Sequence, residues 1–290
     1  MIAVLGASGF IGQNIQEVLI KDYTKACNNV LMIYFNNSKN ILKEFNKISF
    51  DEFIKNRKFL DSVDTLIICC GNSNTHIEEE SLYKFLIRDT KYILQMKDKI
   101  NCNIIFLSSA AVYDGNLGYM KEDERIYPYS LYGICKYNSE MALKYIMQNI
   151  KNKKLIIYRL TYGYGKFERN NRLMPLIKNC IKENKVLKAT GYNNYLNPLS
   201  AEFIAKTIIE TSKNINIFPE SEIINLTSIR KLKLKDILNI ISKNYNLKYE
   251  LVSEEPSIKY SILSEKIEYY LKKLSIPEEF INEKIIDYFK

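Results

Sequence analysis

The chain has 290 residues, of which 47% are hydrophobic and 26% are charged, and this suits one large folded domain or two interlocked ones. Its net charge of +9 comes from lysines spread along the chain, and no basic block is interleaved with aromatic residues. This pattern argues against a nucleic-acid partner and favours a small phosphorylated ligand.

Apolar runs of strand length alternate with helical segments through the first half of the chain. We expect strands at residues 2–5, 30–35, 65–70, 103–107 and 155–158, and helices at 12–20, 81–96 and 131–147. The strands are apolar on both faces, which is typical of a doubly wound parallel sheet in an α/β fold. Such a sheet binds its ligands at the carboxyl ends of its strands.

Beyond residue 165 the pattern changes. We expect helices at 173–181 and 234–241, extended segments at 222–226 and 249–252, and a last helix at 278–289 that Pro277 opens. No linker or repeat divides the chain. The sequence predicts a first domain at 1–165, to which 195–215 returns, and a smaller C-terminal α/β lobe made mostly by 166–290.

A glycine-rich turn follows the first expected strand and opens the first expected helix. It reads Gly6-Ala7-Ser8-Gly9-Phe10-Ile11-Gly12. Small side chains let backbone N–H groups approach a pyrophosphate, and the helix N-terminus favours its negative charge. Because the turn lies between a strand and a helix of an alternating chain, it predicts a dinucleotide site.

The second expected strand ends without a carboxylate. It reads Tyr34-Phe35-Asn36-Asn37-Ser38-Lys39, whereas enzymes that prefer NAD usually carry Asp or Glu here for the ribose 2′-OH. We expect cofactor contacts from Asn36, Ser38 and Lys39. Ser38 and Lys39 suit a 2′-phosphate, which favours NADP slightly over NAD. The alternative is that Lys39 only starts a solvated helix.

Tyr132 and Lys136 share one face of the expected helix 131–147. A nearby ammonium favours the phenolate form of a tyrosine, and a serine hydroxyl beside the pair can hydrogen-bond a substrate oxygen. Together these groups can exchange a proton with a carbonyl/alcohol pair. The spacing alone is weak evidence, because about three Tyr-x-x-x-Lys matches are expected by chance. The chain has three, beginning at Tyr132, Tyr162 and Tyr269.

With these motifs, the chain resembles the extended short-chain dehydrogenase/reductase superfamily over nearly its whole length, in the group of NAD(P)-dependent nucleotide-sugar epimerases, dehydratases and reductases. Besides the glycine turn, four segments carry the resemblance: 63–71, 107–113, 158–165 and 197–202. The second of these delivers Ser109, and Tyr132 follows Ser109 at the interval that the family shows. This interval selects Tyr132 over the other two matches.

The resemblance implies a Rossmann-type domain that binds the dinucleotide and a C-terminal lobe that binds the substrate. It makes Tyr132 the general acid/base, Lys136 the residue that holds the nicotinamide ribose, and Ser109 the partner of the reacting oxygen. The expected cofactor contacts are Gly6, Ser8, Gly9, Phe10, Ile11, Gly12, Asn36, Ser38, Lys39, Cys70, Gly71, Tyr132 and Lys136. The expected substrate contacts are Ser109, Tyr162, Arg172 and Asn197.

Several positions depart from the pattern of the family. Its 4,6-dehydratases carry Asp-Glu after the catalytic Thr, where this chain has Ala110 and Ala111, so we expect no dehydration. An Asn seen in many relatives is missing from segment 86–90. Tyr195 stands where relatives often carry an Arg that grips the diphosphate, and Arg169 or Arg172 is the candidate replacement. The alternative is that both arginines belong to a solvated loop.

Three functional hypotheses remain. The favoured one is a 4-ketoreductase of a nucleotide-linked hexose or deoxyhexose, in which NADPH delivers the hydride and Tyr132 the proton. The alternative is a nucleotide-sugar 4-epimerase that retains its NAD. The third is a non-catalytic dinucleotide-binding protein. The expected partners are a nucleoside-diphosphate sugar and a second copy of the chain, which would pack on helix 131–147 through Leu143, Tyr145 and Ile146.

The remaining features predict a cytoplasmic protein. Six cysteines without a Cys-x-x-Cys pair fit a reducing compartment, and the single histidine, His76, is too few for a usual zinc set, so we expect no metal site. The N-terminus lacks the basic segment of a signal peptide, and no run of about 18 apolar residues predicts membrane insertion. His76 is more simply a polar loop residue than a substrate contact.

Overall fold

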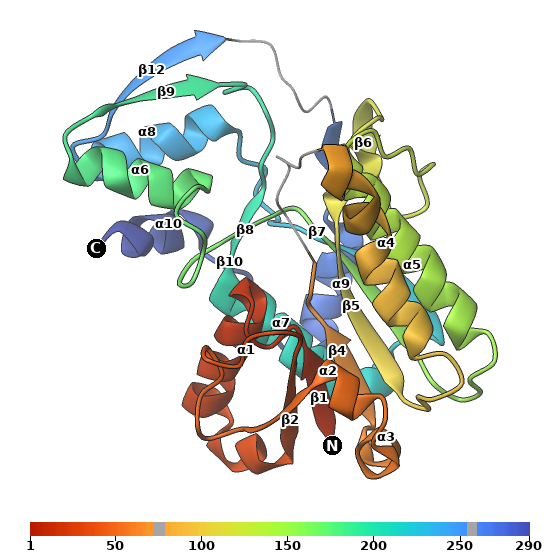
Figure 1. Cartoon of the computed structure of the whole chain (residues 1–290). Helices are drawn as coiled ribbons and strands as arrows, with labels where there is room; N and C mark the ends of the chain where they lie inside the picture. The colour runs from red at the N-terminus through yellow and green to blue at the C-terminus, as the bar shows by residue number, and fades with distance from the viewer. Residues whose placement is uncertain (72–78, 254–259) are drawn as a thin grey trace.

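A seven-stranded parallel sheet forms the centre of the computed structural model, which describes residues 1–71, 79–253 and 260–290 (Figure 1). Its strands are β1 (Ile2–Leu5), β2 (Val30–Tyr34), β3 (Asn46–Ser49), β4 (Thr65–Ile68), β5 (Asn103–Ser109), β7 (Leu155–Leu160) and β11 (Ser221–Leu226). They lie in the order β11-β7-β5-β4-β1-β2-β3. The chain runs outward from β1 to β3 and then crosses back to β4, which confirms the doubly wound, Rossmann-type sheet and puts the ligand crevice beside β1 and β4.

Helices cover both faces of this sheet, because alternate residues of each strand point to opposite faces and both sets are apolar. Val4, Met32 and Ile67 pack with one group of helices: α1 (Phe10–Asp22), α7 (Ala201–Lys213) and α9 (Glu265–Lys273). The strand residues that alternate with them pack with the other group: α2 (Phe50–Phe53), α3 (Arg57–Ser62), α4 (Glu79–Gln95) and α5 (Leu131–Met147).

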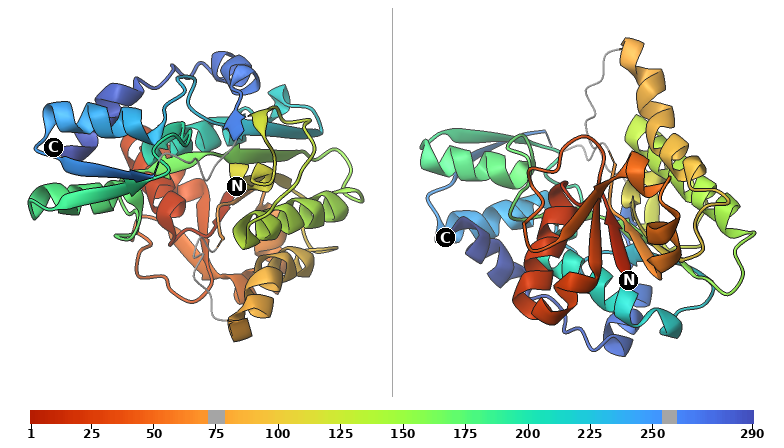
Figure 2. Two further views of the ribbon diagram at one scale, coloured as in Figure 1. Left: turned by 90° about the horizontal axis from the view of Figure 1, so that it is seen from above. Right: turned by 60° about the horizontal axis from the view of Figure 1, so that its bottom comes forward.

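A smaller lobe has its own apolar core. It contains α6 (Leu173–Lys182), α8 (Leu234–Asn244), α10 (Ile281–Phe289) and the parallel pair β9 (Val186–Thr190) and β12 (Lys248–Ser253). Two short parallel pairs lie between the main elements: β8 (Tyr162–Tyr164) with β10 (Pro198–Ser200), and β6 (Gly118–Met120) with β13 (Tyr260–Ile262). The lobe and the pair α4–α5 lie on opposite sides of the molecule (Figures 1 and 2).

The path of the C-terminal half differs from the expectation in two places. β11 pairs with β7 at the edge of the central sheet and α9 packs on it, although both lie within 166–290, which we expected to form mostly the second lobe. The last helix begins at Ile281 and not at residue 278. Glu279 is instead turned toward Ser200, whose backbone N–H donates to Glu279 Oε2 at 2.9 Å.

Short 3₁₀ segments complete the structure: η1 (Thr24–Asn29), η2 (Ala110–Tyr113) and η3 (Ile215–Ile217). The second of them, η2, directly follows β5 and turns the chain at the carboxyl edge of the sheet. Among the described residues, none of the helices combines the length and the apolar composition needed to cross a membrane.

Candidate active site

The glycine turn brings the start of α1 against the ends of β1 and β4. Gly6 has φ +92°, and a Cβ there would lie 2.7 Å from the backbone nitrogen of Cys70. A Cβ at Gly12 would lie 2.4 Å from the carbonyl oxygen of Gly6. Only glycine therefore allows this close approach. Within the described residues no side chain caps α1 at Gly9, so the first N–H groups of the helix can bind an anion, and the turn fits a pyrophosphate.

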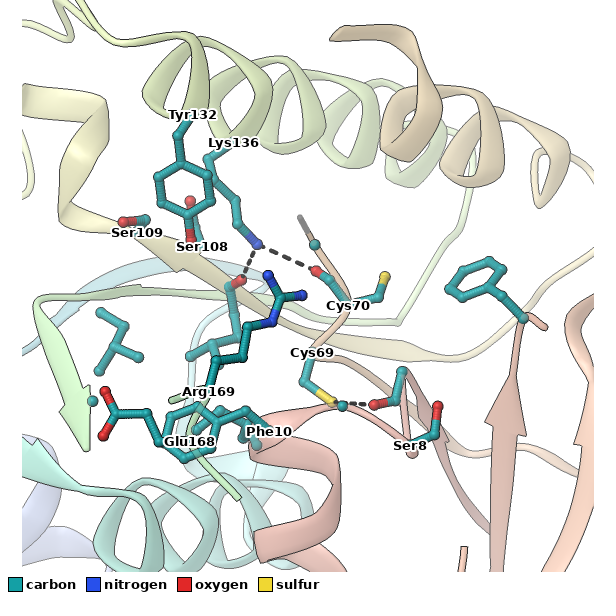
Figure 3. Close-up of a pocket in the computed structure, with 18 of the residues that line it drawn as sticks. Ser8, Phe10, Cys69, Cys70, Ser108, Ser109, Tyr132, Lys136, Glu168 and Arg169 are labelled. Atoms are coloured by element: carbon teal, nitrogen blue, oxygen red, sulfur yellow. Dashed lines mark hydrogen bonds between the residues drawn. The ribbon is translucent and has the colours of Figure 1, made fainter. Parts of the chain in front are cut away.

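A cavity of about 400 Å³ opens at this turn and extends along the carboxyl ends of the strands (Figure 3). Most of the site residues that the sequence predicts line it: Gly6, Ser8, Gly9, Phe10, Ile11, Asn36, Cys70, Gly71, Ser109, Tyr132, Lys136 and Arg172. Residues separated by up to 166 positions in the chain are thus brought to one surface. This is the arrangement expected of a ligand site in a doubly wound fold.

The first turn of α5 positions Tyr132. Ser130 caps the helix, with its Oγ accepting from the backbone N–H of Gly133 at 3.0 Å. Asp114 in turn accepts from the backbone N–H of Ser130 at 3.2 Å. Gly133 fits closely against η2, since a Cβ there would lie 2.2 Å from the carbonyl oxygen of Ala111. The start of the helix is therefore held against the segment that follows Ser109.

Lys136 lies one turn further along α5 and is almost fully buried, with 6% of its surface exposed. Its Nζ donates to the carbonyl oxygens of Leu107, at 2.9 Å, and Cys70, at 3.3 Å (Figure 3). It lies 6.0 Å from the centre of the Tyr132 ring. Two carbonyls thus hold the ammonium between β4 and β5, where its third hydrogen can reach a ligand.

Ser109 is the last residue of β5. Its Oγ accepts from the backbone N–H of Ala111 at 3.2 Å, and its own hydrogen can be given to a substrate oxygen. The next two residues, Ala110 and Ala111, carry only methyl groups, which cannot exchange a proton. The carbonyl oxygen of Ala110 accepts from the phenol of Tyr260 at 2.9 Å, which fixes η2 under the site.

A fully buried polar network lies behind these residues. Glu140 and Arg159 form an ion pair, with Arg159 Nη2 donating to Glu140 Oε2 at 2.8 Å and Nε donating to Oε1 at 3.1 Å. Ser108, beside Ser109, donates to Glu140 Oε1 at 2.6 Å, and Arg159 Nη1 donates to the oxygen of Tyr113 at 2.6 Å. The network therefore joins α5, β5, β7 and η2 directly beneath the catalytic candidates.

Five predicted site residues do not line the cavity: Gly12, Ser38, Lys39, Tyr162 and Asn197. Gly12 instead packs against the backbone of Gly6 within the turn. The side chain of Asn197 is buried and its Oδ1 accepts from the backbone N–H of Leu232 at 3.1 Å, so it ties two loops together and does not face the cavity. Tyr162 donates to Glu168 Oε1 at 3.1 Å and stands behind the cavity wall.

The wall near the end of β2 is aromatic and largely neutral. Phe35 and Tyr92 line it, with ring centres 4.4 Å apart, together with Asn36. Ser38 and Lys39 do not line it, so neither contributes to the cavity wall the contact expected for a 2′-phosphate. Arg88 also lines the cavity, and its guanidinium is paired with Asp89 at 2.7 Å.

Sequence reasoning missed several lining residues. Among them are Phe35, Cys69, Arg88, Tyr92, Ser108, Leu160, Thr161, Gly163 and Glu168. Ser108 could have been suspected from its place beside Ser109, whereas Tyr92 and Glu168 reach the cavity only through the folding of distant segments. His76 lies outside the described residues.

The two neighbouring thiols of the cavity wall, Cys69 and Cys70, are not nucleophiles at neutral pH. Burial raises the pKa of each to about 12, because a thiolate loses its hydration there. Cys69 Sγ lies 3.4 Å from the carbonyl oxygen of Leu5, to which it donates. Both thiols therefore belong to the packing of the crevice.

Comparison with known families identifies the chain. The model of the NAD dependent epimerase/dehydratase family matches residues 2–197. The chain belongs to this family. The match covers the glycine turn, Ser109, Tyr132 and Lys136, together with α6 and β9 of the second lobe.

Individual proteins of known activity are more distant. An N-acetyl-alpha-D-glucosaminyl-diphospho-ditrans,octacis-undecaprenol 4-epimerase of Escherichia coli O157:H7 is 26% identical over 59% of this chain and 51% of its own length. An ADP-L-glycero-D-manno-heptose-6-epimerase of Brachyspira hyodysenteriae is 26% identical over 68% of this chain and 66% of its own. The chain thus spans between half and two thirds of the length of the curated relatives it matches.

The fold is shared with solved epimerases. The UDP-glucuronic acid 4-epimerase of Bacillus cereus, solved with UDP-glucuronic acid and NAD, superposes with a TM-score of 0.79 at 19% identity, over 99% of this chain and 98% of that one. At this identity the similarity concerns the architecture alone, including the Rossmann-type sheet and the second lobe.

Proposed function

We propose that the protein is a 4-epimerase of a nucleoside-diphosphate hexose that keeps NAD bound through turnover. The observation that carries the proposal is the convergence of Ser109, Tyr132 and Lys136 on one cavity that also contains the glycine turn. The family and the activities of its relatives favour this hypothesis over the 4-ketoreductase that the sequence alone favoured.

The residues of the chain have distinct tasks in this reaction. Tyr132 takes the proton of the sugar hydroxyl and later returns it, Ser109 donates a hydrogen bond to the same oxygen, and Lys136 stabilises the phenolate. The nicotinamide supplies the chemistry of accepting and returning a hydride at the sugar carbon. Ala110 and Ala111 offer no acid/base group for the elimination of water, so the keto sugar is protected from dehydration.

NAD is the proposed cofactor. The wall formed by Phe35, Asn36 and Tyr92 suits an uncharged ribose better than a 2′-phosphate, and Ser38 and Lys39 lie outside the cavity. The candidate pyrophosphate site is the turn from Gly6 to Gly12. We infer that the second lobe, with Arg169 and Arg172 at its boundary, holds the diphosphate of the substrate.

Cofactor analysis and an assay without added cofactor test this proposal. Protein denatured after purification should release NAD, and the native protein should interconvert a UDP-hexose and its 4-epimer, followed by proton NMR, with no NAD(P)H supplied. Turnover that consumes one NADPH for each sugar would instead support the ketoreductase. Binding of the dinucleotide without conversion of any sugar would support the non-catalytic hypothesis.

We also propose a homodimer that packs through α4 and α5, on the side away from the second lobe (Figure 2). Leu86, Ile87, Leu94 and Ile134 line an apolar groove between the two helices. The prediction that Leu143 and Ile146 contribute to this interface is wrong, because both side chains are buried in the core under α5. Met141 and Tyr145 are the exposed large side chains of α5.

Leu94→Glu should convert the dimer to a monomer, because Leu94 is 44% exposed at the groove and a carboxylate there cannot be desolvated cheaply. Size-exclusion chromatography with light scattering measures the mass. Leu251→Glu is the matched control, since Leu251 is 43% exposed on β12 in the second lobe. A wild-type monomer, or a dimer retained in Leu94→Glu, would refute this interface.

A further inference from the structure

Glu168 is a buried carboxylate in the wall of the cavity. It lies between β8 and α6, and its side chain is only 2% exposed. Oε1 accepts from the phenol of Tyr162 at 3.1 Å and from Arg172 Nε at 3.4 Å. Oε2 is buried and has no hydrogen-bond partner in the part of the chain that the structure describes.

The unpaired oxygen marks Glu168 as incomplete without a ligand. Buried polar atoms in native proteins are almost always paired, because an unpaired one loses its hydration without compensation. Burial raises the pKa of Glu168 above its usual range, against the opposing effects of Arg172, Tyr162 and the backbone N–H of Gly165. The protein by itself therefore compensates only part of the cost of desolvating this carboxylate.

The place of Glu168 in the cavity points to the sugar. Glu168 and Arg169 come from the side of the cavity that faces Tyr132 and Lys136 (Figure 3). Arg169 and Arg172, which follow Glu168 in the sequence, also line the cavity and carry the charge that suits a diphosphate. The group attached to that diphosphate, in the proposed substrate, is the hexose.

We propose that Glu168 Oε2 accepts a hydrogen bond from a hydroxyl or acetamido N–H group of the hexose, and that this contact selects neutral hexoses over hexuronates. The inference rests on the proposed function and names its substrate class. An ionised carboxylate can only accept, so its partner must be a donor. A hexuronate would bring a second carboxylate, which offers no hydrogen and repels the first.

The fold alone does not determine whether the substrate is a neutral hexose or a hexuronate. The Bacillus cereus structure contains UDP-glucuronic acid, whereas the Escherichia coli relative acts on an N-acetylglucosaminyl group. Both sugar classes therefore occur among proteins similar to this chain. The side chains of the wall must decide between them, and in this chain Glu168 supplies a buried negative charge.

The test compares sugars in the wild type and in Glu168→Gln. The specificity constants for UDP-glucose, UDP-N-acetylglucosamine and UDP-glucuronic acid are measured on the protein as purified. The wild type should prefer the neutral sugars, and Glu168→Gln should reduce that preference by at least about tenfold, because an amide both accepts and donates and can pair with a carboxylate. Glu183→Gln, exposed at the end of α6, is the matched control and should leave the preference unchanged.

Three results would overturn the inference. One is a wild type that prefers UDP-glucuronic acid, and the second is an unchanged preference in Glu168→Gln. The third is loss of bound dinucleotide in Glu168→Gln with an unchanged sugar preference, which would make the cofactor the partner of Oε2. If no sugar is converted, the proposed function fails separately, and calorimetric titration of the same three sugars into both proteins then decides the role of Glu168.

Discussion

Tyr132→Phe should lower kcat by at least about 10²-fold while the protein keeps its dinucleotide. The phenol is the proton-exchanging group of the proposed reaction, and its ring can keep the same place on α5 without the hydroxyl. KM should change much less than kcat, because the lost interaction belongs to the transition state. Sugar interconversion followed by NMR measures kcat and KM, and the absorbance of the cofactor released on denaturation measures the bound dinucleotide.

Tyr129→Phe is the matched control for this variant. Tyr129 precedes α5 by two residues and is 83% exposed, and its backbone N–H donates to Asp114. The substitution keeps that backbone bond, so activity should stay at the wild-type level. Equal activity of Tyr132→Phe and Tyr129→Phe would remove Tyr132 from the mechanism.

Arg159→Met should lower the free energy of unfolding by about 3–5 kcal/mol, because it leaves Glu140 as an unpaired charge in the core. Both side chains are almost fully buried, with 2% of Arg159 and none of Glu140 exposed. The variant also removes the donor to the oxygen of Tyr113. Urea unfolding followed by circular dichroism measures the shift of the midpoint.

Two further variants distinguish the cost of the unpaired buried charge from the cost of any Arg→Met substitution. Arg159→Met combined with Glu140→Leu should regain much of the lost stability, since no charge then remains buried. Arg57→Met breaks an exposed ion pair with Asp61, 70% and 59% exposed, and should cost less than about 1 kcal/mol. If Arg159→Met costs no more than Arg57→Met, the network is not a determinant of stability.

Local patterns were sufficient to predict most of the central domain. The glycine turn, the apolar strands and the helix 131–147 follow from backbone geometry and hydrophobic periodicity, which act over a few neighbouring residues. β3 was missed because Asn46-Lys47-Ile48-Ser49 contains one apolar residue, and only Ile48 is buried when the strand pairs with β2. An edge strand of this kind has almost no signal in its own sequence.

The sequence by itself determined the fold class and the phosphate turn, because both depend on local patterns. Its resemblance to the short-chain dehydrogenase/reductase superfamily supplied the catalytic candidates Ser109, Tyr132 and Lys136. The tertiary structure decided which side chains reach the cavity. Asn197 does not line the cavity, because its side chain is bonded to the backbone of Leu232. Glu168 does line it, because the loop after β8 folds so that Glu168 contacts Tyr162 and Arg172. Such choices depend on contacts between segments that no local pattern relates, and they are what gives the site its proposed substrate class.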